Sequence, residues 1–330
     1  MIKWGVMEFN RFFEAWSRVV SGTQRRWRWV GYGLTALAFL YLAILIFFSR
    51  EQIQQIQWQV YWLPFLLSML IYLGSLLVQF LVWARMISFH HRISWRDITI
   101  YSRVLLMRRL PGGVWHWVDR TAMYTGATNV PGRVIMLANF LEWSLLLLLA
   151  IAIALSGWPG ALVWLRWLAG LPLLLSLYLA YSWQPNQRNT ITRLAESILW
   201  LALYSIAWMA GGLILYLFAR ATQLGVNLTT GAYQPLTYPY SIWSWAIAGG
   251  SSFLLVFIPA GLGVREITLT WLLMPNLPLS GIILVAILIR LTYVLADMVW
   301  GSLGMFFSLR VFKVNDTEIP SAEGYEPSRK

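Results

Sequence analysis

Long apolar runs alternate with short polar segments along most of the chain, and six of these runs are long enough to cross a membrane as helices. They cover residues 30–48, 61–83, 134–156, the segment from the turn at 157–160 to about 182, 198–219 and 282–309. A hydrocarbon core of about 30 Å requires roughly 20 apolar residues in a helix, which these runs match. The pattern predicts an all-α polytopic membrane protein with six crossings.

Two further apolar stretches are broken by proline and glycine, and both carry arginine. The breaks are Pro111, Gly112 and Gly113 in the first stretch and Pro259, Gly261 and Gly263 in the second. Lipid cannot satisfy the backbone groups that such breaks release, so these segments must pack inside protein or line a wet cavity. We therefore predict two re-entrant hairpins, at residues 97–120 and 242–274.

The two ends of the chain differ from the apolar body. Residues 1–28 place aromatic and aliphatic side chains at helical spacing with charged residues between them, which predicts an amphipathic helix lying in the membrane interface. Residues 313–330 are polar and are predicted to form a disordered cytoplasmic tail.

The distribution of positive charge predicts the orientation. Lys and Arg accumulate on the cytoplasmic side of membrane proteins. Both ends of the chain and the loops after the second and fourth runs are basic, whereas the other loops are short or nearly uncharged. Both termini are therefore predicted to be cytoplasmic, in the cell membrane. The first hairpin would then enter from the cytoplasm and the second from outside.

The two halves of the chain, residues 29–156 and 157–312, are related by an internal alignment. Placing Pro111 on Pro259 without gaps also places Glu142 on Arg290 and aligns two span starts. Each half then holds three crossings and one hairpin, and an odd number of crossings inverts one half relative to the other, as in many transporters. Chance alignment of two proline and glycine kinks is the alternative interpretation.

Four charged residues are predicted to form a charge gate inside the membrane: Glu142, Glu266, Arg290 and Asp297. Glu142 and Arg290 lie at similar depths, and an unpaired charge there costs at least about 2.5–3.5 kcal/mol. An ion pair between them is the simplest expectation. Asp297, two turns further along the same helix face, is the competing partner of Arg290. A static pair that only locks the bundle is the alternative to a gate.

Arginines cluster around both breaks and are the candidate residues for binding a lipid phosphate or headgroup. They are Arg103, Arg108, Arg109 and Arg120 near the first break and Arg265 after the second. Guanidinium groups grip phosphate with two hydrogen bonds, and glycine lets backbone N–H groups approach it. Interfacial anchoring of the first group, and mutual pairing of Arg265 with Glu266, are the alternatives.

Composition narrows the class of protein. Hydrophobic residues make up 59% of the chain and charged residues 12%, as expected of a polytopic membrane protein. The net charge of +12 comes from arginines that flank or interrupt apolar runs, so the expected partner is an anionic lipid surface and not nucleic acid. With no cysteine and three histidines, we expect no metal and no cofactor.

Two motifs carry a family resemblance: Leu110-Pro111-Gly112-Gly113-Val114-Trp115, followed by Arg120 and Glu142, and Ile258-Pro259-Ala260-Gly261-Leu262-Gly263-Val264-Arg265-Glu266. They resemble the flippase-like transmembrane domain of the lysylphosphatidylglycerol synthases and its stand-alone relatives, over residues 30–310. The resemblance implies a membrane protein that moves a lipid or a lipid-linked saccharide between leaflets. The aminoacyl-transferase domain of the two-domain synthases has no counterpart before Lys330, so lipid aminoacylation is not expected.

The expected partners are thus an anionic phospholipid or lipid-linked saccharide and the membrane, and the sequence leaves a homo-oligomer open. No catalytic or nucleotide motif is visible, so the chain is not expected to be an enzyme. One alternative is a polyprenyl-dependent membrane glycosyltransferase, although the outer loops offer it only Glu51 and Glu266 as carboxylates. The other is a non-transporting assembly subunit of a glycan or lipid pathway.

Overall fold

The computed structural model describes Phe47 and residues 61–107, 115–128, 130–158, 164–185, 187–225, 233–254 and 264–315. Every regular element in these ranges is a helix, and they contain no strand, which confirms the predicted all-α class. The predicted interfacial helix 1–28, almost all of the span 30–48, both proline-glycine breaks and residues 316–330 lie outside the described residues.

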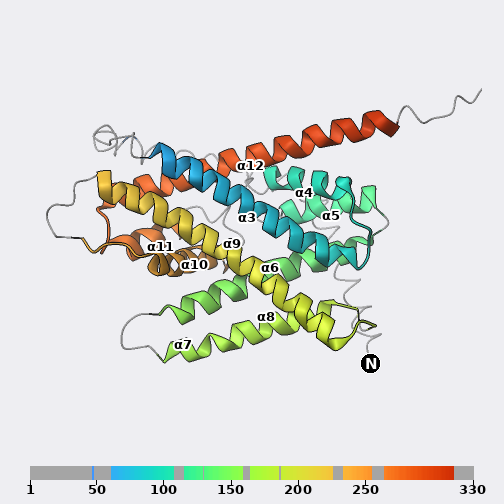
Figure 1. Ribbon diagram of the computed structural model, residues 1–330, viewed down its shortest axis with the longest axis horizontal. Helices are drawn as coiled ribbons and strands as arrows, with labels where there is room; N and C mark the ends of the chain where they lie inside the picture. Colours follow the sequence, from blue (N-terminus) through green and yellow to red (C-terminus); the bar gives the residue numbers. More distant parts are fainter. Residues whose placement is uncertain are drawn as a thin grey trace, which may run out of the picture.

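Five helices in this part of the chain are long and apolar enough to cross a membrane. They are α3 (Trp62–Ser88), α6 (Gly132–Ser156), the combined α7 (Leu165–Leu168) and α8 (Gly170–Trp183), α9 (Thr190–Gly225) and α12 (Leu279–Asn315). Figure 1 shows these helices running roughly along the long axis of the molecule. The five predicted spans that fall on described residues are therefore confirmed as membrane-length helices.

Two helix boundaries differ from the prediction. Residues 183–197 were expected to be a polar loop, but α9 already begins at Thr190. Asn189 caps the start of the helix, because its Oδ1 accepts a 3.1 Å hydrogen bond from the Ile191 N–H. Arg193 in the first turn is also paired: its Nη2 donates a 2.9 Å hydrogen bond to the Tyr181 carbonyl, and the guanidinium lies 3.9 Å from the centre of the Tyr181 ring. At the other end, α12 continues to Asn315, so residues 313–315 are helical and not part of a disordered tail.

Each predicted hairpin consists of two short helices on either side of its break. The first pair is α4 (Trp95–Met107) and α5 (Trp115–Ala127), and the second is α10 (Tyr238–Leu254) and α11 (Val264–Leu273). The helices of each pair contact one another. The first pair lies toward the right-hand end of the molecule and the second toward the left-hand end (Figure 1). The α5 helix extends to Ala127, further than the predicted end of the hairpin at residue 120.

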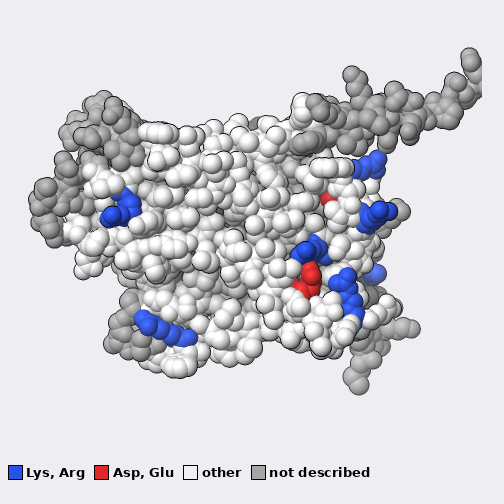
Figure 2. Space-filling model, viewed as in Figure 1, with Lys and Arg blue, Asp and Glu red and all other residues white. Residues whose placement is uncertain are grey.

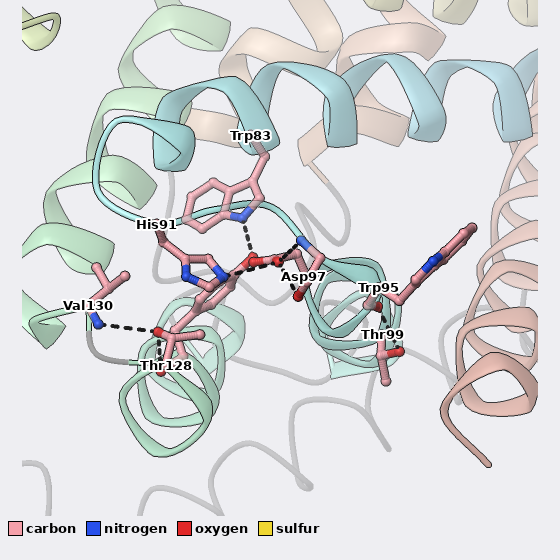
Figure 3. Close-up of polar contacts among 9 residues, drawn as sticks. Trp83, His91, Trp95, Asp97, Thr99, Thr128 and Val130 are labelled. Atoms are coloured by element: carbon pink, nitrogen blue, oxygen red, sulfur yellow. Dashed lines mark hydrogen bonds and ion pairs between the residues drawn. The ribbon is translucent and has the colours of Figure 1, made fainter. Parts of the chain in front are cut away.

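A buried carboxylate fixes the start of α4. Asp97 is fully buried, and its Oδ2 accepts hydrogen bonds from the backbone N–H and the hydroxyl of Ser94, at 2.7 and 3.0 Å. This is one half of a capping box, in which the carboxylate of the third helical residue accepts the N–H of the residue before the helix. His91 Nε2 lies 3.3 Å from the same oxygen (Figure 3).

A second buried contact ties α5 to α3. Trp83 Nε1 donates a 2.9 Å hydrogen bond to the Tyr124 hydroxyl. Burial raises the pKa of Tyr124, and the negative charge of Asp97 raises it further, so the hydroxyl keeps its proton. Together with the Asp97 cap, this bond holds the first helix pair against the end of α3.

Tryptophans seated on glycines join α9 to α10. Trp208 of α9 packs on Gly249 of α10, where an added Cβ would lie 2.6 Å from the indole ring, and Trp245 of α10 packs on Gly211 of α9 in the same way. Trp208 Nε1 also donates a 3.1 Å hydrogen bond to the Leu146 carbonyl of α6. Small residues let helices approach closely inside a membrane. Here the glycine contacts join α9 to α10, and the Trp208 hydrogen bond joins α9 to α6.

Surface charge is concentrated at one end of the molecule. Figure 2 shows most of the blue Lys and Arg atoms at the right-hand end, near α4, α5 and the start of α9. The exposed arginines in the helix ends and loops there are Arg85, Arg92, Arg96, Arg103, Arg133 and Arg188. Arg166, at the start of α7, and Arg220, near the end of α9, belong to the other end of the molecule (Figure 1). The long apolar surfaces between the two ends carry little charge in this view (Figure 2).

Candidate functional site

A cavity of about 240 Å³ lies among the helices, and both helix pairs contribute to its wall. Its aromatic lining includes Tyr101, Trp117, Trp143, Trp208, Trp245 and Tyr293. Pockets for drug-sized ligands usually measure about 300–1,000 Å³. This cavity therefore has room for a small polar group and not for a whole lipid with its acyl chains.

The first ion pair of the cavity joins α5 to α6. Arg120 Nη1 donates hydrogen bonds to Glu142 Oε2 at 2.6 Å and to Asn139 Oδ1 at 3.0 Å. The guanidinium carbon lies 4.1 Å from the Trp83 ring centre and 4.8 Å from that of Tyr101, and the residue is only 3% exposed. Arg120 is therefore held by a carboxylate, an amide and two aromatic faces.

The predicted pair between Glu142 and Arg290 is wrong. Glu142 is bound to Arg120, and Arg290 donates to Glu266 Oε1 from Nη2 at 2.7 Å and from Nε at 2.8 Å. Similar depth in the membrane is compatible with several partners. Each of these two residues pairs with a charge on the short helix that packs beside it. Asp297, the competing partner that the sequence suggested for Arg290, lies two turns further along α12 and is 1% exposed.

The two observed ion pairs have opposite polarity. The alignment of Pro111 with Pro259 places α5 on α11 and α6 on α12. In the first half the short helix supplies the arginine and the long helix the glutamate, and in the second half these roles are exchanged. The paired residues are 22 positions apart in the first half and 24 in the second. Each short helix is thus tied to the long helix that follows it by a buried ion pair.

Arg265 differs from the other two arginines. It lines the cavity with a side chain 12% exposed, and its nearest carboxylate oxygen, on Glu266, is 3.6 Å from Nε. Within the described part of the chain it donates no hydrogen bond. Its guanidinium carbon lies 5.4 Å from the Trp245 ring centre and 5.8 Å from that of Tyr293. Glu266 is thus shared by two arginines: it accepts hydrogen bonds from Arg290 and forms a longer ion pair with Arg265.

Two buried donors beside the first ion pair are also without a partner among the residues that the structure places. They are Asn139 Nδ2 and Arg120 Nε. The bond from Arg120 to Asn139 Oδ1 defines which amide atom is the acceptor, and so leaves Nδ2 as a donor. A buried donor without an acceptor costs about 1–3 kcal/mol, so these groups favour an oxygen-rich ligand.

The charges around the cavity leave an excess of one. The charged side chains that line it are Arg120, Glu142 and Arg265. The net charge of these three side chains is +1. Such a site favours an anion.

The remaining predicted residues divide into two groups. Arg103 is exposed on α4 and does not line the cavity, as expected of an interfacial anchor. The others lie outside the described residues: Arg108, Arg109, Pro111, Gly112, Gly113, Pro259, Gly261 and Gly263.

Sequence reasoning missed Asn139 and Gln79, which both line the cavity. Each is a single amide within an apolar span. That isolation was the available signal, because polar residues inside membrane helices usually face the interior of the bundle.

No family model, curated protein or solved structure matches the chain. The resemblance to the flippase-like domain of the lysylphosphatidylglycerol synthases therefore stays a prediction.

Proposed function

We propose that the protein moves a lipid, or a lipid-linked saccharide, with an anionic headgroup between the two leaflets of the cell membrane. The headgroup occupies the cavity while the acyl or prenyl chains remain in the surrounding lipid. The observation that carries the proposal is Arg265, a largely buried guanidinium that lines the cavity and has no hydrogen bond within the described chain.

The cost of burying this charge supports a ligand. A cation inside a membrane protein is expensive unless it is paired, and such residues commonly mark a substrate path. Arg290 already occupies Glu266, so an incoming phosphate would supply the oxygen atoms that Arg265 lacks. A guanidinium can bind two phosphate oxygens at once.

The finer architecture belongs to the same proposal: six crossings, two re-entrant hairpins and an inverted internal repeat, with both termini in the cytoplasm. The location of the two helix pairs toward opposite ends of the molecule supports it (Figure 1). So does the concentration of exposed arginines at one end. Transporters with inverted repeats commonly place broken helices around a central site.

The ion pairs give the proposal a mechanism. Binding of an anion to Arg265 weakens its attraction to Glu266 and leaves that carboxylate to Arg290 alone. The pairs Arg120–Glu142 and Glu266–Arg290 keep each short helix attached to its long neighbour. Each half can then move as a unit around the headgroup, which would open the cavity to one leaflet and then to the other.

Reconstituted protein provides the test. Phosphatidylglycerol is placed in the inner leaflet of liposomes, and its arrival outside is followed by periodate cleavage of the headgroup diol. Native protein should transport well above empty liposomes, and Arg265→Gln should lose at least about tenfold in rate, the equivalent of ~1.4 kcal/mol. Arg103→Gln, a change of an exposed arginine on α4, is the matched control. Equal rates for Arg265→Gln and the control would overturn the proposal.

The orientation has a separate test, because the chain contains no cysteine. Single cysteines at Arg188 and Trp164, which are both exposed, lie at opposite ends of the α7–α8 span. An impermeant thiol reagent added outside intact cells should label Trp164→Cys and leave Arg188→Cys unlabelled. The reverse result would invert the proposed orientation.

A further inference from the structure

We infer that the cavity selects headgroups in which an uncharged polyol, such as a sugar ring or glycerol, is joined to the lipid through one phosphate, and that it rejects headgroups bearing an ammonium group. This inference rests on the proposed transport function and names its substrate class. It follows from the contacts that the carboxylates, aromatic rings and amides of the cavity already make, and from the volume of the cavity.

Each carboxylate of the two ion pairs already has an arginine partner. Glu142 Oε2 accepts a 2.6 Å hydrogen bond from Arg120, and Glu266 Oε1 accepts bonds of 2.7 and 2.8 Å from Arg290. A lipid ammonium group would have to compete with a guanidinium that is already in place. It would also enter a group of side chains that carries a net positive charge, where like charges repel.

Aromatic rings can bind ammonium groups without any carboxylate, but three rings of the cavity lining already face the protein's own cations. Arg120 lies over Trp83 and Tyr101, and Arg265 lies near Trp245 and Tyr293. A cation–π site needs the cation within about 6 Å of the ring centre, and the guanidinium groups occupy these positions. Tyr101, Trp245 and Tyr293 are therefore not free to form a cage for choline, ethanolamine or an aminoacyl group.

The amides suit hydroxyl groups. Asn139 is fully buried and offers Nδ2 as a donor. On the facing helix α3, Gln79 Nε2 donates to Ser75 Oγ at 3.3 Å, which leaves Gln79 Oε1 as an acceptor. A hydroxyl both donates and accepts, so a polyol can satisfy the two kinds of group together. An ammonium group has only donors and would leave Asn139 Nδ2 unsatisfied.

The size of the cavity limits the polyol to a single unit. The cavity volume of about 240 Å³ lies below the range of about 300–1,000 Å³ that is usual for drug-sized ligands. One sugar ring or glycerol with its phosphate is of this order, whereas an oligosaccharide is far larger.

The test compares intact headgroups in the same proteoliposomes. Phosphatidylglycerol and phosphatidylinositol are detected by periodate cleavage of their diols. Phosphatidylethanolamine and lysylphosphatidylglycerol are detected with an impermeant amine reagent. We expect both polyol lipids to be transported at least about tenfold faster than both amine lipids, a difference of ~1.4 kcal/mol.

Variants separate selection by the amides from selection by charge. Asn139→Leu should slow phosphatidylinositol and phosphatidylglycerol several-fold while the amine lipids stay at their low rate. Gln79→Met is a second variant with the same expectation, should the first fail to fold. Unchanged polyol transport in a folded variant would overturn the role of the amides.

The outcomes distinguish this inference from the proposed function. Equal transport of all four lipids that depends on Arg265 would overturn headgroup selection and leave transport intact. Transport of none of the four, with the protein folded, would count against both. Faster transport of lysylphosphatidylglycerol than of phosphatidylglycerol would overturn the inference directly.

Discussion

Arg120 Nη1 lies 2.6 Å from Glu142 Oε2, in a contact where the two side chains are only 4% and 11% exposed. This ion pair holds α5 against α6 and forms part of the cavity wall. Removal of one partner would leave the other charge buried without compensation, which is much more costly than removal of both.

The first prediction concerns this asymmetry. Arg120→Met should lower the free energy of unfolding by about 3–5 kcal/mol, because it leaves the Glu142 carboxylate unpaired. Arg120→Met combined with Glu142→Leu should recover most of the loss. Unfolding of the purified protein in mixed detergent micelles, followed by circular dichroism, measures both. If Arg120→Met unfolds at the same denaturant concentration as the exposed control Arg103→Met, the ion pair does not stabilise the fold.

The second prediction concerns the packing of Trp208 against Gly249. In Gly249→Ala the new Cβ would lie 2.6 Å from the indole ring, so α9 and α10 must move apart. Overpacking of this kind costs about 1–3 kcal/mol of stability. Gly74→Ala in α3 is the matched control, since its Cβ would meet nothing within 4 Å. Replacement of a helical glycine there should be neutral or stabilise by up to about 1 kcal/mol. Equal stability of the two variants would contradict the packing.

The third prediction concerns the start of α4. Ser94→Ala removes the hydroxyl that donates to the buried Asp97 carboxylate and should cost about 1.5–3 kcal/mol, the usual contribution of a hydrogen bond to a charged group. The effect should be local, so hydrogen exchange of the first turn of α4 is the most sensitive measurement. Ser88→Ala is the comparison, because its hydroxyl is exposed and bonds only to the Arg85 carbonyl. Protection of that turn that is unchanged in Ser94→Ala would show that the cap is not needed.

The sequence predicted the long helices because span length is a local property. A run such as 134–156 must be about as long as the membrane is thick, and α6 begins and ends within two residues of it. The polar start of α9 carries one local signal, the cap residue Asn189, which the expectation of a polar loop over 183–197 did not use. The contact of Arg193 with Tyr181, on the neighbouring helix α8, is not visible in any local pattern.

The candidate site was less accessible to sequence reasoning. Glu142 and Arg290 were correctly singled out as charges inside apolar spans, but choice of partner depends on which helix packs beside each. The cavity amides Asn139 and Gln79 come from α6 and α3, and only the tertiary fold brings them to one wall. Inverted polarity of the two ion pairs likewise became visible only once both partners were known.

The last prediction uses Glu266 and Arg290, which act on Arg265 in opposite directions. Glu266→Gln removes the carboxylate 3.6 Å from Arg265, so the cavity becomes more positive and should hold an anionic headgroup more tightly. Half-saturation should then occur at a lower lipid content, and the maximal transport rate should fall because release is slower. Arg290→Gln leaves Glu266 to neutralise Arg265, so half-saturation should move to a higher lipid content.

Transport measured over a range of phosphatidylglycerol contents separates these two effects. The control Arg103→Gln alters an exposed charge and should change neither quantity. Shifts of half-saturation in the same direction for Glu266→Gln and Arg290→Gln would contradict the electrostatic mechanism, because a loss of packing would act alike in both variants. Opposite shifts, with both variants folded, are expected only if Arg265 meets the charge of the headgroup.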